Sequence, residues 1–362
     1  MVENREIHRR KTKKRRKKKP TPGMIIGRIA IVIVTTLLML VLFLFSVVFV
    51  LIKGPSKNAG ELFTLSANET SAMKWLPKLF LSEEEHQAII NPQITPDTFV
   101  EFSTAKSISN NTDTSSDSSD AQADSSANYT DEIEVIDIKG PTYKGKLMIV
   151  HDPSRVSFAS INSFGEVGIT LSQFLDRFDA IACTNAGGFE DEGGMGKGGI
   201  PDGIVIRDGK IVYGSAGGHY SGFAGFDANH MLHVGNMSGQ QALNEGVVNG
   251  TSFTGGPVLI KDGVRQTGFI SGINPRTCIG QSADGSVLLV AIEGRMADSL
   301  GATFENLADL MEEYGAINAC NMDGGSSSGM YYEGERITRS CSVVGDRPLP
   351  TAIIVTGGGS NE

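Results

Sequence analysis

The stretch INACNMDGGSSSGM, residues 317–330, decides how this chain is interpreted. A short apolar run ends in an acid, two glycines and three hydroxyls, which is typical of a buried strand that stops at a sharp turn. The glycines permit positive φ and let a ligand approach the backbone closely, because they carry no Cβ. Asp323 then lies at the carboxyl end of the strand. The segment predicts either a reactive carboxylate beside an anion site or an ordinary Asp-Gly turn.

A second apolar run of the same kind lies upstream. Residues 286–292 end at Glu293, and residues 303–314, between the two runs, carry apolar side chains at the spacing of an amphipathic helix. A strand–helix–strand crossover makes its two strands parallel neighbours. We therefore expect Glu293 and Asp323 at the same edge of one sheet, where open α/β sheets bind their ligands.

The rest of the domain is dominated by strand and tight-turn signals. Residues 178–184 form an apolar run that opens onto Asn185, and apolar runs flank Asp-Gly pairs within residues 205–212 and 258–264, as in β-hairpins. The sequence predicts an α+β domain over residues 132–356. We expect a mixed, strand-rich sheet with few helices, whose glycine-rich loops at strand ends form the site.

The charge of the chain is divided unevenly along its length. The 362 residues carry a net charge of −9, yet residues 1–23 hold eleven Lys or Arg and two Glu. The remainder is strongly acidic, which excludes a nucleic-acid partner for the folded part. With 40% hydrophobic residues, the length suits one sizeable domain with appendages.

An uncharged apolar run of 24 residues, 29–52, follows the basic tail. It exceeds the ~20 residues that span a bilayer and the ~7–15 apolar residues of a signal peptide. Because positive residues concentrate before it, we expect the tail (1–23) in the cytoplasm, one membrane-spanning anchor (24–52) and everything after it outside the cell. A stalk over residues 53–102 and a disordered Ser/Asp-rich linker over residues 103–131 should lead to the domain.

Metal and thiol chemistry find little support in the sequence. The four cysteines are dispersed, which argues against zinc; we expect small core residues, with one disulfide left open. Glu190, Asp191 and Glu192 predict either a weak Ca²⁺ site or, more simply, a solvated acidic loop. The chemistry inferred below requires no metal or other cofactor.

Six short motifs together suggest a family. They are NAGGF (185–189), FTGGP (253–257), PRTCIG (275–280), EGR (293–295), NMDGG (321–325) and RPLPTA (347–352). With them, residues 145–356 resemble the phosphodiester glycosidase family. The resemblance implies hydrolysis of a sugar-1-phosphodiester between the anomeric carbon and the phosphate oxygen. Together with the anchor, it implies an enzyme of the cell envelope that acts on a cell-surface polymer, such as an exopolysaccharide, or on a glycan.

The reaction and the resemblance together indicate the site residues. Glycosidases use one carboxylic acid and one carboxylate, and a phosphate leaves readily enough to make the acid less important. Asp323 is the candidate nucleophile or base and Glu293 the second candidate, although the family more often has Asp-Gly at that second position. Guanidinium forks match phosphate oxygens, and the candidate phosphate ligands are Arg276, Arg295 and Arg347.

Further contacts are expected from the loops. Asn185 is expected to bond the sugar, or else to cap its strand. Ser326 stands where the family usually has a third glycine, so its hydroxyl either enters the site or only occupies the turn. The backbone N–H groups expected at the anion site are those of Gly187, Gly188, Gly324 and Gly325. Ordinary ion pairs are the simpler alternative for Glu293 and for the arginines.

Two rival functions remain open at this point. The first is a non-catalytic envelope module that binds phosphopolysaccharide through the same pocket, although a binding-only protein would more often lack Asp323, Glu293 or an arginine. The second is a metal-dependent phosphodiesterase that cuts the P–O bond. That enzyme needs a dense His/Asp cluster, which the sequence does not offer.

Overall fold

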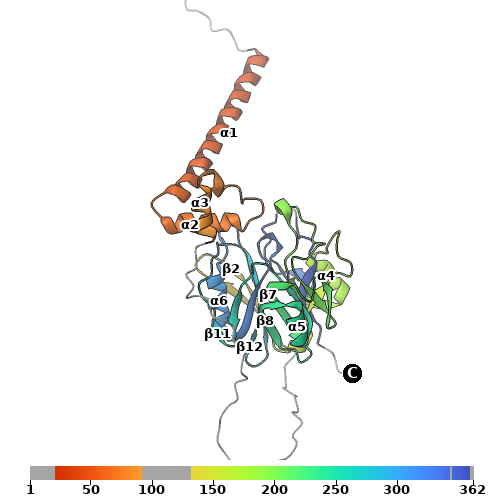
Figure 1. Cartoon of the computed structure of the whole chain (residues 1–362). Helices are drawn as coiled ribbons and strands as arrows, with labels where there is room; N and C mark the ends of the chain where they lie inside the picture. Colours follow the sequence, from red (N-terminus) through yellow and green to blue (C-terminus); the bar gives the residue numbers. More distant parts are fainter. Residues whose placement is uncertain (1–20, 92–131, 343–344, 359–362) are drawn as a thin grey trace, which may run out of the picture.

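The computed structural model describes residues 21–91, 132–342 and 345–358. The predicted linker and most of the basic tail lie outside these residues. A long helix, α1 (Pro22–Lys53), stands away from a strand-rich body, and the stalk helices α2 (Lys57–Asn68) and α3 (Glu83–Ile90) lie between the two (Figure 1). The described part of the stalk, residues 54–91, is therefore folded, and it brings the end of α1 next to the domain (Figure 1). Residues 92–102 of the predicted stalk lie outside the described residues.

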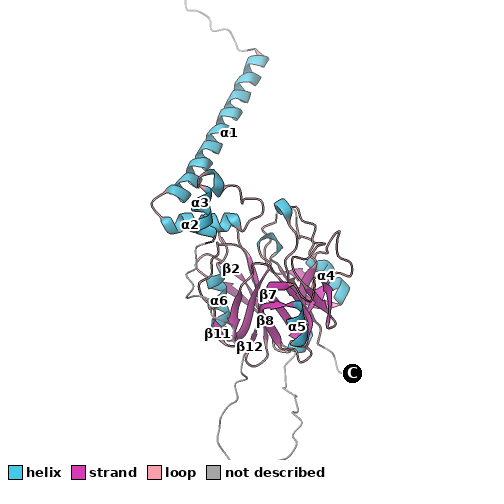
Figure 2. Ribbon diagram, in the orientation of Figure 1, coloured by secondary structure: helices cyan, strands magenta, loops and turns pink. Residues whose placement is uncertain are grey.

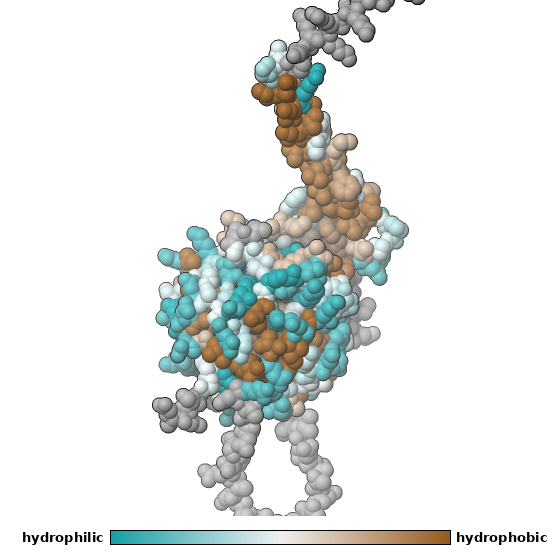
Figure 3. Space-filling view, turned by 180° about the vertical axis from the view of Figure 1, so that it is seen from behind, coloured by the Kyte–Doolittle hydropathy of each residue, from teal (hydrophilic) through white to brown (hydrophobic). Residues whose placement is uncertain are grey.

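Helix α1 is the one helix in the described part of the chain that is long and apolar enough to cross a membrane. Its 32 residues extend about 48 Å, and none is buried by the rest of the protein. Thr35 and Ser46 donate their hydroxyls to the carbonyls of Ile31 and Leu42, so these polar groups are satisfied within the helix. Figure 3 contrasts the apolar surface of α1 with the mixed surface of the domain.

The largest sheet carries the two strands that the sequence singled out. All its pairs are antiparallel in the described part of the chain, in the order β1-β2-β13-β12-β14-β10-β11. The strands are β1 (Ile133–Lys139), β2 (Lys144–Val150), β13 (Val287–Ile292), β12 (Arg276–Ser282), β14 (Ala316–Met322), β10 (Val258–Lys261) and β11 (Val264–Arg265). Helix α6 (Phe304–Glu313) packs on one face, where Leu307 and Met311 join Cys278 and Ala319 in the core.

The expectation that the strands before Glu293 and Asp323 are neighbours is wrong. Strand β12 lies between β13 and β14 and pairs antiparallel with both. The reason is local: β12 and β13 form a hairpin through the turn 283–286, so the crossover through α6 must pass over β12 to reach β14. Strands β13 and β14 still run in the same direction, and both end at the same edge of the sheet.

Two five-stranded sheets complete the body. One has the order β16-β15-β4-β17-β3 and the other β6-β5-β9-β7-β8. Their strands are β3 (Val156–Ser160), β4 (Ala180–Asn185), β15 (Met330–Tyr332), β16 (Glu335–Arg336) and β17 (Thr351–Thr356), and β5 (Val205–Arg207), β6 (Lys210–Tyr213), β7 (His219–Asp227), β8 (Leu232–Ser238) and β9 (Val247–Ser252). The remaining helices are α4 (Leu171–Phe178) and α5 (Gly239–Asn244). Both predicted hairpins form, with positive φ at Asp208 and Asp262 as an Asp-Gly turn requires.

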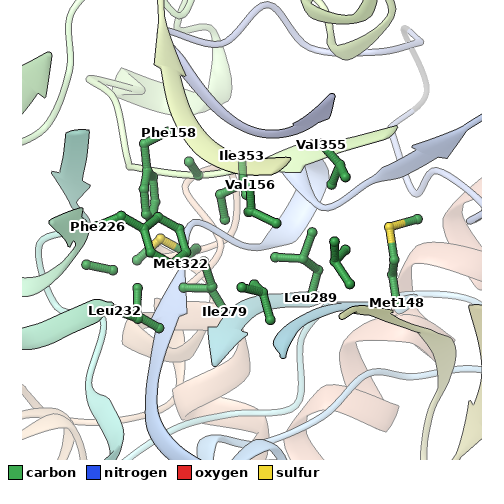
Figure 4. Packing of buried hydrophobic residues seen from close by; sticks show 14 of the residues in the cluster. Met148, Val156, Phe158, Phe226, Leu232, Ile279, Leu289, Met322, Ile353 and Val355 are labelled. Atoms are coloured by element: carbon green, nitrogen blue, oxygen red, sulfur yellow. The ribbon is translucent and has the colours of Figure 1, made fainter. Parts of the chain in front are cut away.

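One apolar cluster contains residues of all three sheets. Met322 and Ile279 of the large sheet pack with Ile353 of the second sheet and Phe226 of the third (Figure 4). The rings of Phe158 and Phe226 lie 5.8 Å apart. All four cysteines are free, and three are buried, as expected of core residues. The predicted strand-rich α+β domain with few helices is confirmed (Figure 2). Asp323 directly follows β14, which is an interior strand of the large sheet.

Candidate active site

A cavity of about 560 Å³ lies between the domain and the stalk, at the end of β14. Seven of the predicted site residues line it: Arg276, Arg295, Asp323, Gly324, Gly325, Ser326 and Arg347. Residues 68–72 and Lys74 of the stalk form part of its wall, together with the loops that carry Phe189, Asp191, Asp202 and Thr254. The structure thus gathers Asp323, three further carboxylates and three guanidinium groups around one space.

Asp323 is held in place through its backbone. Its N–H donates to the carbonyl of Ala186 (2.9 Å), and its own carbonyl accepts from Nδ2 of Asn185 (2.6 Å). Oδ1 of Asp323 accepts from the N–H of Gly324 (2.8 Å). Asn185 is itself fully buried, where its Oδ1 accepts from Oγ1 of Thr277 and the N–H of Gly329. Asn185 therefore fixes the backbone of Asp323 through a buried hydrogen bond and does not line the cavity.

The environment of Asp323 tunes its acidity. Burial raises the pKa of this carboxyl from 3.8 to about 7, against opposing hydrogen bonds from Ser327 and Gly324 and the positive charge of Arg347. The side chain nevertheless keeps partial access to the cavity. A carboxyl with a pKa near neutrality changes protonation state at ordinary pH, which is characteristic of acid–base and nucleophilic groups.

Arg347 is the guanidinium whose positive charge acts on Asp323. Its Nη1 and Nη2 bind the two carboxylate oxygens of Asp191 at 2.8 and 2.7 Å, and Nη1 also reaches Oγ of Ser326 at 3.2 Å. The guanidinium carbon lies 4.9 Å from the ring centre of Phe189. Arg347 holds the pKa of Asp191 below its usual range. Asp191, considered above as a Ca²⁺ ligand, is therefore committed to orienting this arginine.

Arg276 is bonded to a residue that the sequence did not suggest. Its Nη2 donates to Oε2 of Glu69 in the stalk (2.6 Å) and to the carbonyl of Gly272 (2.7 Å), and the guanidinium stacks on Phe304 at 4.1 Å. Glu69 also accepts from the N–H of Gly272 (2.6 Å) and from Nδ2 of Asn274 (2.9 Å). Burial lowers the pKa of Arg276, and Glu69 opposes this effect. The Glu69 carboxylate, with its three donors, thus occupies the position beside Arg276 where the phosphate was expected to bind.

Arg295 lies between the stalk and the glycine turn. Its Nη2 donates to Oγ1 of Thr70 (2.9 Å) and Oδ1 of Asn274 (3.1 Å). Its backbone is left-handed, with φ of 57°, which is uncommon for a residue that carries a side chain and often marks a functional site. Gly325 has φ of 63°, and a Cβ on it would come within 3.3 Å of the Arg295 guanidinium. The turn therefore favours glycine chiefly for its backbone, since a Cβ would meet only the flexible end of the Arg295 side chain.

Three predicted residues besides Asn185 lie outside the cavity lining. Glu293 accepts from the backbone N–H (2.8 Å) and from Nη2 (2.6 Å) of Arg339, so its carboxylate is engaged away from Asp323. The N–H of Gly187 donates to Thr351, and the N–H of Gly188 to Ser252. The N–H groups of Gly324 and Gly325 also have protein acceptors, in Asp323 and Pro275. The anion-binding capacity of this site therefore resides in side chains.

Metal ligands are not grouped in the described part of the chain, where no set of three or more His, Cys, Asp and Glu residues could hold an ion.

Residues of the stalk are the main contributors to the cavity that the sequence did not predict. Glu69, Thr70 and Ser71 lie more than 60 residues before the resembling segment, and their neighbours carry no motif. Only the fold places them against the loops of the domain.

Comparisons with known proteins agree with this picture. Residues 178–356 match the model of the phosphodiester glycosidase family. The SPbeta prophage-derived uncharacterized protein YomE of Bacillus subtilis is 30% identical over 197 residues, which are 51% of this chain and 29% of that protein. N-acetylglucosamine-1-phosphodiester alpha-N-acetylglucosaminidase of mouse is 26% identical over 144 residues, 35% of this chain and 28% of that protein. The chain spans less than a third of the length of either relative.

A solved structure shares the fold. It is the catalytic domain of zebrafish N-acetylglucosamine-1-phosphodiester alpha-N-acetylglucosaminidase, described as auto-inhibited by its pro-peptide. The TM-score is 0.51 at 21% identity, and the match covers 64% of this chain and 85% of that one. Together with the family match, this likeness confirms the resemblance that the six motifs indicated.

Proposed function

Since residues 178–356 belong to the phosphodiester glycosidase family, we propose that this protein hydrolyses a sugar-1-phosphodiester between the anomeric carbon and the phosphate oxygen. The proposed substrate belongs to a cell-surface polymer or glycan. One observation carries the proposal: Asp323, whose pKa is raised to about 7, shares a cavity with Arg347, Arg295 and Arg276. A carboxylate beside several guanidinium groups suits a neutral carbon centre attached to an anionic leaving group.

The proposed chemistry assigns Asp323 to the anomeric carbon. In its ionised form it either attacks that carbon to give a glycosyl-enzyme, which water then opens, or deprotonates the water that attacks directly. The phosphate departs as a stable anion, so a strong general acid is not required. Arg347 and Arg295 would neutralise the charge that develops on the phosphate oxygens, as preorganised guanidinium groups do. Neither step requires a metal or cofactor.

The location of the enzyme is part of the proposal. Helix α1 would anchor the chain once in the cell membrane, with the basic tail in the cytoplasm and the domain outside. The length and composition of α1 and the eleven basic residues before it support this topology. The domain would then act on glycans of the cell envelope that lie within reach of the membrane.

Turnover by the full chain in nanodiscs tests the proposal. The substrate is a simple diester, methyl N-acetylglucosamine 1-phosphate, and the readout is free N-acetylglucosamine. Loss of one general acid or base typically costs about 10²–10⁴-fold in rate, and loss of a nucleophile costs more, so we expect Asp323→Asn to lower kcat by about 10²-fold or more. The matched control is Asp284→Asn, in an exposed turn after β12, which should retain full activity. Binding of the diester without turnover, equal in wild type and Asp323→Asn, would instead identify a non-catalytic module.

A further inference from the structure

The stalk folds back along the apolar part of α1. The ring of Phe80 lies 4.7 Å from the ring of Phe45 and 6.2 Å from that of Phe49, and Nζ of Lys53 bonds Oε1 of Glu85 at 2.7 Å. Phe45 precedes the last residue of α1 by about 12 Å along the helix axis. The ~20 residues that span a bilayer, counted from the start of the predicted anchor at residue 24, end close to Phe45. When α1 crosses a bilayer in this position, the segment that carries Phe80 lies level with the boundary between lipid chains and head groups.

This same segment exposes large apolar side chains. Trp75 is 59% exposed, Leu79 58% and Met73 42%, and these three residues are called the apolar patch below. The indole Nε1–H of Trp75 already donates to the carbonyl of Ala72 (3.0 Å), so no donor is left unsatisfied if the ring enters lipid. Lys74 and Lys78 alternate with the patch. Aromatic and aliphatic side chains interleaved with lysines are typical of segments that sit in a membrane interface.

The patch is also continuous with the wall of the cavity. Ala72 and Lys74, on either side of Met73, line the cavity. The segment just before them is fixed to the domain, because Glu69 bonds Arg276 (2.6 Å) and Ser71 bonds Asp191 (3.4 Å). The cavity wall therefore runs directly into the surface that adjoins α1, and Figure 1 shows the stalk between α1 and the loops of the domain.

We propose that the apolar patch seats in the outer interface of the membrane that α1 crosses, and that the cavity takes a sugar-1-phosphodiester whose other ester arm is a membrane lipid. This inference rests on the proposed function and narrows its substrate class. The lipid chain stays in the bilayer beside Trp75 and Leu79, while the sugar phosphate rises past Lys74 toward Arg347 and Asp323. The cleaved bond is the one already proposed: water replaces the lipid phosphate at the anomeric carbon, and the lipid leaves as its phosphate monoester.

Trp75 provides a direct readout of the seating, since it is the only tryptophan of the chain. The full chain is reconstituted in phosphatidylcholine vesicles that contain lipids brominated in the upper acyl chain, which quench a buried indole. We expect Trp75 to lose most of its emission. The matched control is Trp75→Phe with Val264→Trp, which moves the indole to an equally exposed position on β11 and should keep its emission. If brominated lipid reduced the emission of Trp75 and of the control Trp equally, the seating would be overturned. The patch would then be covered by something other than lipid, such as a second copy or another protein.

The substrate class is tested by comparing the kinetics of two diesters. N-acetylglucosamine 1-phosphate esterified to a long prenol in vesicles is compared with its water-soluble methyl ester. Because burial of each large apolar side chain is favourable, we expect Trp75→Glu with Leu79→Glu to lower kcat/KM for the prenyl ester about tenfold or more and to leave the methyl ester unchanged. An equal effect on both esters, or none on either, would overturn the lipid substrate. If Trp75 is quenched but neither ester is hydrolysed, the proposed function and the substrate class are both refuted and the seating is upheld. If the esters are hydrolysed but Trp75 is not quenched, the seating alone is refuted.

Discussion

Replacement of Asp323 by asparagine should make the protein more stable as well as inactive. Burial raises the pKa of this carboxyl from 3.8 to about 7, so ionisation of Asp323 opposes folding. Below about pH 4 the folded and unfolded states both hold the proton. Between that value and about pH 7 only the folded state holds it, so the free energy of unfolding falls as pH rises. The amide in the Asp323→Asn variant has no such proton to lose and escapes this effect.

The magnitude follows from the shift. At about 1.4 kcal/mol for each tenfold change in the acid constant, complete ionisation costs up to about 4 kcal/mol. Because the side chain has partial access to solvent, we expect about 2 to 4 kcal/mol. For a domain of this size, about 1 kcal/mol moves the melting temperature by roughly 2–4 °C. About 1 to 3 kcal/mol of this falls between about pH 5 and pH 8, because part of the cost already develops below pH 5. The gap between Asp323→Asn and wild type should therefore widen by roughly 3 to 10 °C over this range.

The assay is thermal unfolding of the full chain in nanodiscs, followed by circular dichroism. Asp284→Asn is the control, because a hydrogen bond from Ser282 lowers the pKa of Asp284. Its carboxylate is ionised in both states across this pH range, so its gap to wild type should stay constant. A constant gap for Asp323→Asn as well would refute the buried, proton-holding carboxyl on which the site depends.

Three further predictions concern the groups around Asp323. Glu69→Ala leaves buried Arg276 without its carboxylate partner and should lower the free energy of unfolding by about 3 kcal/mol. The double variant Glu69→Ala with Arg276→Met should recover part of this loss. If the losses of the two single variants simply added in the double variant, the pair would not be coupled. Arg347→Lys loses the two-point bond to Asp191 and should lower kcat/KM about 10- to 100-fold, with unchanged kinetics counting against a role in holding phosphate. EDTA should leave the rate of diester hydrolysis unchanged. If EDTA abolished the activity and added Zn²⁺ or Mn²⁺ restored it, the protein would be a metal-dependent phosphodiesterase.

Local chemistry explains which parts of the fold could be predicted. Asp323 follows a strand because an apolar run meets two glycines, and α6 forms where an amphipathic pattern begins after Thr303, whose hydroxyl caps the helix. The pairing of β12 between β13 and β14 could not be predicted in the same way. It depends on which strand fills the space under the crossover, and β12, with the sequence RTCIGQS, is not an apolar run that would mark it as a central strand.

The site shows the same limit. Arg347 and Asp323 stand out through their motifs, and the structure places both at the cavity. Glu293 has the composition of a second catalytic acid, yet its carboxylate meets Arg339, which is 46 residues further along the chain. Gly187 suggests an anion site, but a Cβ there would come within 2.4 Å of Oγ1 of Thr251, so packing alone requires glycine. Glu69 carries no local signal at all, because its role arises only when the stalk docks on the domain.

The position of the cleaved bond is the most direct test of the central claim. The full chain in nanodiscs is incubated with methyl N-acetylglucosamine 1-phosphate in ¹⁸O-labelled water, and both products are analysed early by mass spectrometry, before the free anomeric hydroxyl exchanges with solvent. We predict label in the sugar, at the anomeric carbon, and none of this product from Asp323→Asn. Label in the phosphate would show that the P–O bond is cut, and would contradict a glycosidase that acts through Asp323.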